Sequence, residues 1–306
     1  MTSRKQRGSP VVRVRRRGLF VVSRVAAQGV CALLAVWVLS GCSALQIAYT
    51  FAEDMLESHA EEYLDLSTEQ EAHLERQSAA LVAWHRRAML PKYAAFFTEQ
   101  ADIAASGGWT GPQLAASFAR FRVLLDETVE GASPFVAAIL AGHTAPKKTA
   151  YPAKRIAEKN AERSAERADR SPEEAIEAWV ERRVERISRF TGVLTEGQVA
   201  IIRGYAERGM VYAERWYDNR TKRQDALIAF LRAKPSRDEI ARFVHRILLY
   251  AHEIVDPDYR QVTEARWALS EGMYFAVLSS LGEEQRRELI STLRSYAEDM
   301  VSLAEV

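Results

Sequence analysis

The strongest constraint on the fold is a helix-start pattern that recurs along the chain. The segments that carry it are LSTEQ (66–70), WTGPQ (109–113), RSPEE (170–174), LTEGQ (194–198), KPSRDE (234–239) and LGEEQ (281–285). In all but the last, Ser or Thr stands three residues before Gln or Glu, so each side chain can accept a hydrogen bond from the other residue's amide. RSPEE adds Pro at the first helical position, and LGEEQ has Gly at the cap. Helices are therefore expected to begin at all six places.

Between these starts, apolar residues recur at steps of three or four, as on one face of a helix. The stripes are Leu45, Ala48, Ala52, Met55, His59, Tyr63 and Leu66; Leu114, Phe118, Phe121 and Leu125; Ile240, Val244, Ile247 and Ala251; and Leu289, Leu293, Ala297 and Met300. No stretch alternates with period two for long enough to indicate a sheet. We predict an all-α, antiparallel multi-helix bundle of roughly eight to ten helices, preceded by a signal segment.

One segment is much poorer in apolar residues than the rest. From Pro146 to Arg170, alanines at every fourth position form a thin seam among alternating charges, and Arg155, Lys159 and Arg163 each have Glu three residues on. Such a segment is typical of a solvated connector helix, with a partner-binding arm as the alternative. The predicted organisation is a signal peptide (1–41), an N-terminal helical lobe (42–143), a charged connector (144–170) and a C-terminal helical lobe (171–306).

The N-terminal segment has the charge pattern of an export signal. The first 41 residues carry eight Lys or Arg and no acid, while the remainder carries 34 basic against 41 acidic residues. After Arg24 comes VAAQGVCALLAVWVLSG, which is uncharged and shorter than the roughly 20 residues that span a bilayer. Arg16-Arg17 faintly resembles a twin-arginine signal, and a start near Val21 or Val22 would give a signal of ordinary length. The export route therefore stays open, but without another basic run of this density we expect no nucleic-acid partner.

Cys42 is best interpreted as a point of lipid attachment. Leu39, Ser40, Gly41 and Cys42 resemble the lipobox of bacterial lipoproteins, in which the signal is cut before the cysteine and its thiol and amine are acylated. The alternative is an ordinary small residue at the end of an uncleaved anchor. Cys31 would be removed with the signal, so neither a disulfide nor a cysteine metal site is expected. Apart from covalent diacylglycerol and an acyl chain on Cys42, no cofactor is expected.

The sequence contains no recognisable catalytic or metal-binding motif. None of the six histidines has Glu three residues before it, as a helical di-metal site would require. There is also no His-Glu-x-x-His, no Gly-x-Ser-x-Gly and no phosphate-cradling Gly-rich loop. His245 and His252 lie seven residues apart, nearly on one helical face, and are interpreted as surface residues. We therefore expect no enzymatic activity and no metal site.

Two stretches are unusually rich in aromatic and basic residues. The first, AWHRRAMLPKYAAFF (83–97), places Trp84, His85, Arg86 and Arg87 before a proline at position 91 that should end or restart a helix. We predict that these four residues and Trp216 line a groove for a partner.

In the second stretch, AERWYDNRTKRQDALIAFL (213–231), two arginines occupy positions of an apolar stripe. This stripe continues by steps of three or four to Arg220 and Arg223, and its earlier members are Val199, Ile202, Ala206, Gly209, Ala213 and Trp216. Because an unpaired buried charge is costly, we predict that these arginines pair with an acid of the first helix, such as Glu53, Asp54 or Glu57. Solvated arginines at the lip of a groove, or an anion-binding groove between the two stretches, are the alternatives.

The order and spacing of several segments resemble a known family. The lipobox, YLDLSTEQEAHL (63–74), AWHRRAMLPKYAAFF (83–97), VERISRFTGVLTEGQ (184–198) and ERWYDNRTKRQ (214–224) resemble a family of proteobacterial lipoproteins of unknown function over most of residues 30–255. The resemblance implies envelope localisation and a helical fold, and it implies no activity.

These observations together predict a lipid-anchored, periplasm-facing helical lipoprotein that acts as a binding or structural module of the bacterial cell envelope. Ser rather than Asp at position 43 resembles lipoproteins sorted to the outer membrane, with the inner membrane as the alternative. The expected partners are membrane lipid, through Cys42, and an unidentified envelope protein. The alternative function is a carrier or chaperone for a lipid or an unfolded chain, which would need an apolar cavity between helices.

Overall fold

A computed structural model describes residues 44–305. The predicted signal peptide, its cleavage residues Leu39, Ser40 and Gly41, and the lipidation residue Cys42 lie outside the described residues. From residue 48 onward the described residues form one compact unit. Helices α3 to α13 all belong to this unit, and its internal packing positions the site.

The described residues form helices and connecting loops without a strand, so the predicted all-α fold is confirmed. In chain order the elements are α2 (Ala44–Thr50), α3 (Ala52–Tyr63), α4 (Thr68–Ala88), α5 (Leu90–Ala105), α6 (Gly111–Ala141), α7 (Pro146–Ala168), α8 (Pro172–Thr191), α9 (Glu196–Gly209), the short 3-10 helix η1 (Met210–Tyr212), α10 (Ala213–Arg232), α11 (Arg237–Leu249), the 3-10 helix η2 (Ala251–Glu253), α12 (Tyr259–Ser279) and α13 (Glu283–Ala304). Between α2 and α13, no helix is both long enough and apolar enough to cross a membrane.

All six predicted helix starts are confirmed. The cap residues Ser67, Thr110, Ser171, Thr195, Ser236 and Gly282 precede α4, α6, α8, α9, α11 and α13. The hydrogen bond from the amide of the cap residue back to the Gln or Glu side chain three residues later also forms as expected. The amide of Thr110 donates to Gln113 Oε1 at 2.9 Å, and the amide of Ser171 donates to Glu174 Oε2 at 2.8 Å. These local bonds satisfy amides that a helix start leaves without partners.

The apolar stripes are confirmed in the C-terminal part of the chain and are only partly correct elsewhere. All four predicted residues of α13 and all four of the α11 stripe are buried. In contrast, the stripe expected along one first helix is divided at Phe51 into α2 and α3, and α3 has no buried residue. Met55, expected in this stripe, is 62 % exposed, and Phe121 of α6 is also exposed. Because the expected first helix is divided in this way, the described residues contain more helices than the eight to ten predicted.

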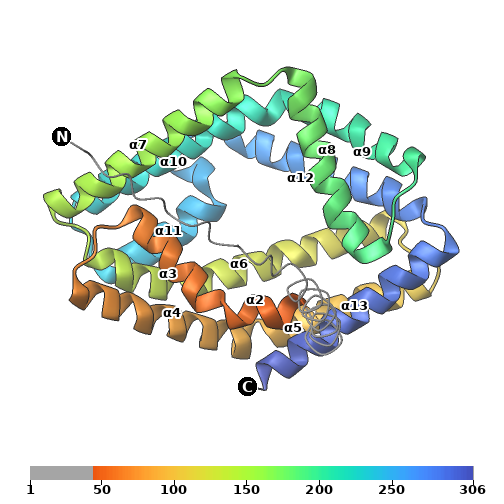
Figure 1. The fold of residues 1–306 in the computed structure, drawn as a ribbon, viewed down its shortest axis with the longest axis horizontal. Coiled ribbons are helices and arrows are strands. Elements are labelled where there is room, and N and C mark those ends of the chain that lie inside the picture. Colours follow the sequence, from red (N-terminus) through yellow and green to blue (C-terminus); the bar gives the residue numbers. More distant parts are fainter. Residues whose placement is uncertain (1–43, 306) are drawn as a thin grey trace, which may run out of the picture. The chain divides into compact units, whose positions relative to one another are not determined.

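Helices that are distant in sequence pack side by side within residues 48–305. Figure 1 shows α13 along α5, α11 along α6, and α10 along α7. The buried side chains gather in several clusters, of which one joins α8, α9 and α12, another joins α5 and α13, and a third joins α6, α10 and α11. Helices from both predicted lobes thus pack on each other, while the division into lobes at 42–143 and 171–306 stays a prediction.

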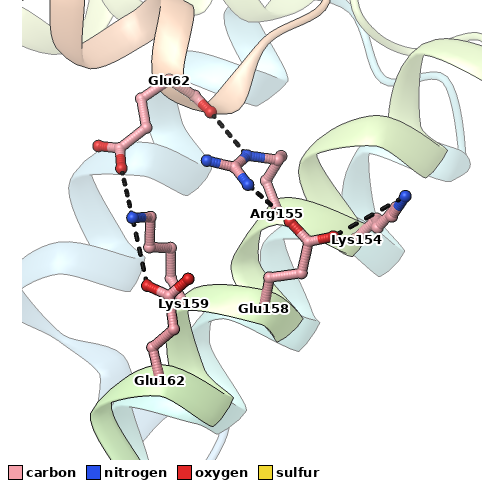
Figure 2. Close-up of polar contacts among 6 residues, drawn as sticks. All are labelled: Glu62, Lys154, Arg155, Glu158, Lys159 and Glu162. Atoms are coloured by element: carbon pink, nitrogen blue, oxygen red, sulfur yellow. Dashed lines mark hydrogen bonds and ion pairs between the residues drawn. The ribbon is translucent and has the colours of Figure 1, made fainter.

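The charged segment expected as a connector is helix α7, and it is held at the end of α3. Figure 2 shows that Lys159 Nζ lies 3.1 Å from Glu62 Oε1 and 3.3 Å from Glu162 Oε2. Arg155 Nε donates to the main-chain oxygen of Glu62 at 3.3 Å, and its Nη1 donates to Glu158 at 2.6 Å. Two of the three expected pairs spaced three residues apart therefore form, and both residues also reach across to α3.

Candidate functional site

The predicted partner residue Trp84 lies in a packed interface between α4 and α6. Its ring centroid is 6.1 Å from that of Phe135, and the indole covers Gly131, where an added methyl group would meet three ring atoms within 3.0 Å. Only glycine admits so close an approach of a large ring to a helix backbone. Trp84 therefore joins α4 to α6.

Next to Trp84, His85 is half-buried between two tyrosines. Tyr49 Oη lies 2.6 Å from His85 Nδ1, and the Tyr93 ring centroid is 5.6 Å from that of His85. Burial lowers the pKa of His85 below its usual value. Burial, followed by the proximity of Tyr93, raises the pKa of Tyr49 to about 12, although Arg86 opposes the shift. His85 is thus held as a neutral imidazole at pH 7.

The two arginines that follow His85 differ in their surroundings. Arg86 Nη2 donates to the main-chain oxygen of Tyr49 at 3.4 Å, and its guanidinium lies 5.6 Å from the centroid of that ring. Arg87 is exposed. This end of α4 is therefore largely occupied by contacts with Tyr49 and Tyr93.

Trp216, Arg220 and Arg223 lie apart from these residues, on α10. Helix α4 packs on α3, α5, α6 and α13, whereas α10 packs on α7, α11 and α12. Neither arginine forms an ion pair within residues 44–305, so the predicted pairs with Glu53, Asp54 or Glu57 are absent from the part of the chain that the structure describes. The 3-10 helix η1 separates α9 from α10, yet Ala206, Gly209, Ala213 and Trp216 of the predicted stripe all face one groove.

A groove with a volume of about 530 Å³ opens beside Trp216, between α8, α9, η1, α10 and α12. Its lining residues are Trp179, Arg182, Arg183, Arg186, Tyr205, Ala206, Gly209, Met210, Tyr212, Ala213, Trp216, Tyr217, Arg266, Leu269, Ser270 and Met273. We call it the arginine–aromatic groove. Of the predicted partner residues, Trp216 lines it, whereas Trp84, His85, Arg86 and Arg87 do not.

The groove combines four arginines and five aromatic rings with no carboxylate. The guanidinium of Arg266 lies 5.9 Å from the centroid of Trp216, and that of Arg183 lies 4.9 Å from the centroid of Trp179. Such stacking holds both guanidinium groups over rings. Arg183 Nη1 also donates to Tyr274 Oη at 3.4 Å. None of the four arginines forms an ion pair with the residues that the structure describes.

This geometry suits recognition of an anionic group. Arginine presents a planar fork of donors that matches carboxylate and phosphate oxygens, and aromatic rings offer rigid apolar contact area. The groove therefore offers both positive charge and apolar contact area.

Sequence reasoning did not find the arginines of α8. Arg182, Arg183 and Arg186 lie on neighbouring positions of α8 and alternate with Glu181 and Glu185, a pattern typical of a solvated helix laced with ion pairs. Their common orientation toward α9 and α12 follows from packing around Val180 and Ile187, and the sequence alone does not show it.

A second polar contact that the sequence did not reveal joins α6 to α11. His245 Nε2 lies 2.5 Å from Asp126 Oδ1, and the hydroxyl of Tyr250 donates to Asp126 Oδ2 at 2.6 Å. Burial raises the pKa of Asp126, but the hydrogen bonds from Tyr250 and His245 outweigh it and lower the pKa overall. His245, interpreted as a surface residue, is half-buried and thus ties two helices together.

The fold and the site define an all-α protein with an arginine- and aromatic-lined groove. The chain belongs to the family of unknown function DUF6279, whose model matches residues 62–260. This match confirms the predicted membership of an uncharacterised family, and it contains all of α8, α9 and α10. The lipobox precedes the matched range. No curated protein and no solved structure is significantly similar to the chain.

Proposed function

We propose that this chain is a lipid-anchored, periplasm-facing binding module of the bacterial cell envelope, attached to the outer membrane through acylated Cys42. The anchor is supported by the basic and then apolar N-terminal segment that ends in Leu-Ser-Gly-Cys at residues 39–42. Two or three acyl chains would hold the protein at a membrane almost permanently, since each buried methylene contributes about 0.8 kcal/mol.

Apolar side chains near the anchor are consistent with a membrane surface. Phe51 and Met55, at and just after the start of α3, are 53 % and 62 % exposed. They follow Cys42 by only nine and thirteen residues. Side chains of this kind gain free energy when they contact the boundary of a bilayer, which supports a short tether.

The observation that carries the binding role is the arginine–aromatic groove, with its four arginines and no acid. We propose that its partner is an envelope protein that presents an acidic segment. Carboxylates of that segment would accept hydrogen bonds from the guanidinium groups, while Trp179 and Trp216 would supply contact area. A carrier for lipids or unfolded chains would instead be favoured by a lining of Phe and Leu side chains.

The proposal is tested by photo-crosslinking in cells. A photoreactive phenylalanine analogue replaces Tyr212, which lines the groove, or Val193, which is 88 % exposed and outside it. We expect an adduct from position 212 only, with the crosslinked peptide being an acidic segment of an envelope protein.

The charge of the groove provides the control. Arg182→Glu with Arg186→Glu reverses two exposed groove cations, and Arg76→Glu with Arg170→Glu reverses two exposed arginines elsewhere. The adduct should be lost in the first pair and kept in the second. An adduct that survives reversal of the groove charges, or that forms equally from position 193, would contradict the proposed function.

A further inference from the structure

Helices α7 and α10 lie side by side and antiparallel, in a register fixed by two contacts. Asn160 Nδ2 donates to Gln224 Oε1 at 2.9 Å, and the guanidinium of Arg167 lies 3.8 Å from the ring centroid of Tyr217. Asn160 and Arg167 are seven residues apart on α7, and their partners Gln224 and Tyr217 are seven residues apart on α10. Arg163, between Asn160 and Arg167, therefore lies opposite the stretch between Tyr217 and Gln224.

In this register two like charges lie near each other. Arg163 does not form the ion pair with Glu166 that its sequence pattern predicts, although Arg155 and Lys159 on the same helix do form theirs. Arg163 instead lies near Arg220 of α10. Burial, and then the charge of Arg163, lower the pKa of Arg220. In place of the third expected pair, two cations therefore lie near each other.

The neighbouring turns of α10 add buried polar atoms that have no partner. Asn219 is 0 % exposed, and neither Nδ2 nor Oδ1 of its amide forms a hydrogen bond within residues 44–305. Arg223 Nε and Arg163 Nη1 are also buried and unpartnered among the described residues. Buried polar atoms in native proteins are rarely left in this state, and a ligand is one reason for an exception.

No nearby carboxylate neutralises this group. Asp256, which precedes α12, lies 3.4 Å from both Arg215 and Lys222. Arg223 is flanked by Arg220, Arg266 and Tyr259, and its pKa is lowered by its burial. Water could satisfy the Asn219 amide, but it would leave three guanidinium charges close together without a counter-charge.

We propose that Arg163, Asn219, Arg220 and Arg223 form a binding site for a phosphoryl group, carried either by a phospholipid headgroup or by free phosphate. The oxygens of a phosphoryl group can accept from several N–H groups at once, and its charge offsets the repulsion among the arginines. The site adjoins the arginine–aromatic groove, because Arg220 lies 5.9 Å from the ring of Trp216 and Arg223 lies near Arg266, but none of its four residues lines that groove. Binding of a phosphoryl group here does not depend on the partner proposed for the groove.

The test uses the full-length Cys42→Ala protein, so that the acyl anchor does not itself bind membranes. Its melting temperature is measured in inorganic phosphate and in chloride of equal ionic strength, and its binding is measured to vesicles of phosphatidylglycerol and of phosphatidylcholine. A phosphate concentration well above Kd should raise Tm by about 5 °C or more. A rise in phosphate identifies the free anion as a ligand, and binding to phosphatidylglycerol without such a rise identifies the headgroup.

Two variants separate binding from folding. Arg163→Gln and Arg223→Gln should each weaken the phosphate or headgroup response about ten-fold or more, because each removes a charge-assisted hydrogen bond. Both variants should melt at or above the wild-type temperature in chloride, since each removes an unpaired cation. Arg76→Gln with Arg287→Gln, both exposed and distant in sequence from the site, should leave the response unchanged.

The proposal is overturned if neither phosphate nor phosphatidylglycerol binds, or if binding is equally strong in Arg163→Gln and Arg223→Gln. It is also overturned if both variants melt well below the wild-type protein in chloride, because the arginines would then have stabilising partners in the free protein. The crosslinking experiment at the groove concerns other residues and another readout, so failure of one proposal leaves the other standing.

Discussion

Replacing Gly131 by alanine should destabilise the protein, although alanine is the better helix former. Gly131 lies within α6, and a methyl group built there would lie 2.5 Å from Trp84 Cη2 and 2.8 Å from Cε2. Carbon atoms in optimal contact are about 3.5–4.0 Å apart, so the indole ring would have to move by about 1 Å or more. Trp84 would then lose its packing on Phe135 and its contact with His85.

Two opposing contributions set the size of the effect. Alanine in place of glycine favours the helix by about 1 kcal/mol, whereas overpacking a well-filled interface costs about 1–3 kcal/mol and more when a large ring must be displaced. We expect a net loss of about 2 kcal/mol in the free energy of unfolding. For a domain of this size the corresponding fall in Tm is about 4–8 °C.

The matched control is Gly204→Ala in α9, where an added methyl group has no neighbour within 4 Å. That variant should be stabilised by about 0.5–1 kcal/mol. The assay is chemical denaturation followed by circular dichroism, with Trp84→Leu added to Gly131→Ala to relieve the overlap. If Gly131→Ala is as stable as Gly204→Ala, the indole does not cover Gly131 and the argument for Trp84 as a structural residue fails.

Two further predictions concern the partly buried titrating groups Asp126 and Tyr49. Asp126→Asn should lower stability at pH 7 by about 1 kcal/mol or less, because Asp126 is partly exposed. The pKa of Asp126 is lowered in the folded state, so its contribution to stability is present above the unfolded pKa of about 4 and is lost as pH falls through the folded value. The stabilities of wild type and variant should therefore converge in acid unfolding measurements near pH 2. An undiminished difference in stability at that pH would contradict this prediction. The pKa of Tyr49 is raised to about 12, so the stabilisation from keeping it protonated is complete below pH 10 and is lost between pH 10 and 12. Tyr49→Phe should remove a phenol that ionises near pH 12 in an absorbance titration, and an unchanged titration curve would refute the assignment.

The sequence predicts the helices well wherever the determining contacts are local. A capping box depends on residues three apart, so the starts at Ser171 and Ser236 could be predicted without knowledge of the fold. The α13 stripe from Leu289 to Met300 was equally clear, because a helix with one buried face keeps a regular period. These features need no information about which helix packs on which.

The site was harder to predict because it depends on contacts between distant helices. Arg163 has Glu166 within reach on its own helix, and only the docking of α10 brings it to Arg220 instead. Likewise, nothing local marks Gly131 as the residue that admits Trp84. In contrast, the part of the predicted stripe that crosses η1 keeps one face, because Ala206, Gly209, Ala213 and Trp216 all line the arginine–aromatic groove.

The measurement that tests the central proposal most directly is the intact mass of the membrane-extracted protein beside that of a Cys42→Ala variant, with separation of inner and outer membranes. The proposal predicts a chain that begins at Cys42, carries the mass of diacylglycerol and an acyl chain, and is recovered in the outer-membrane fraction. The variant should lack that added mass. An unmodified chain of all 306 residues would contradict the lipid anchor and the envelope location that depends on it.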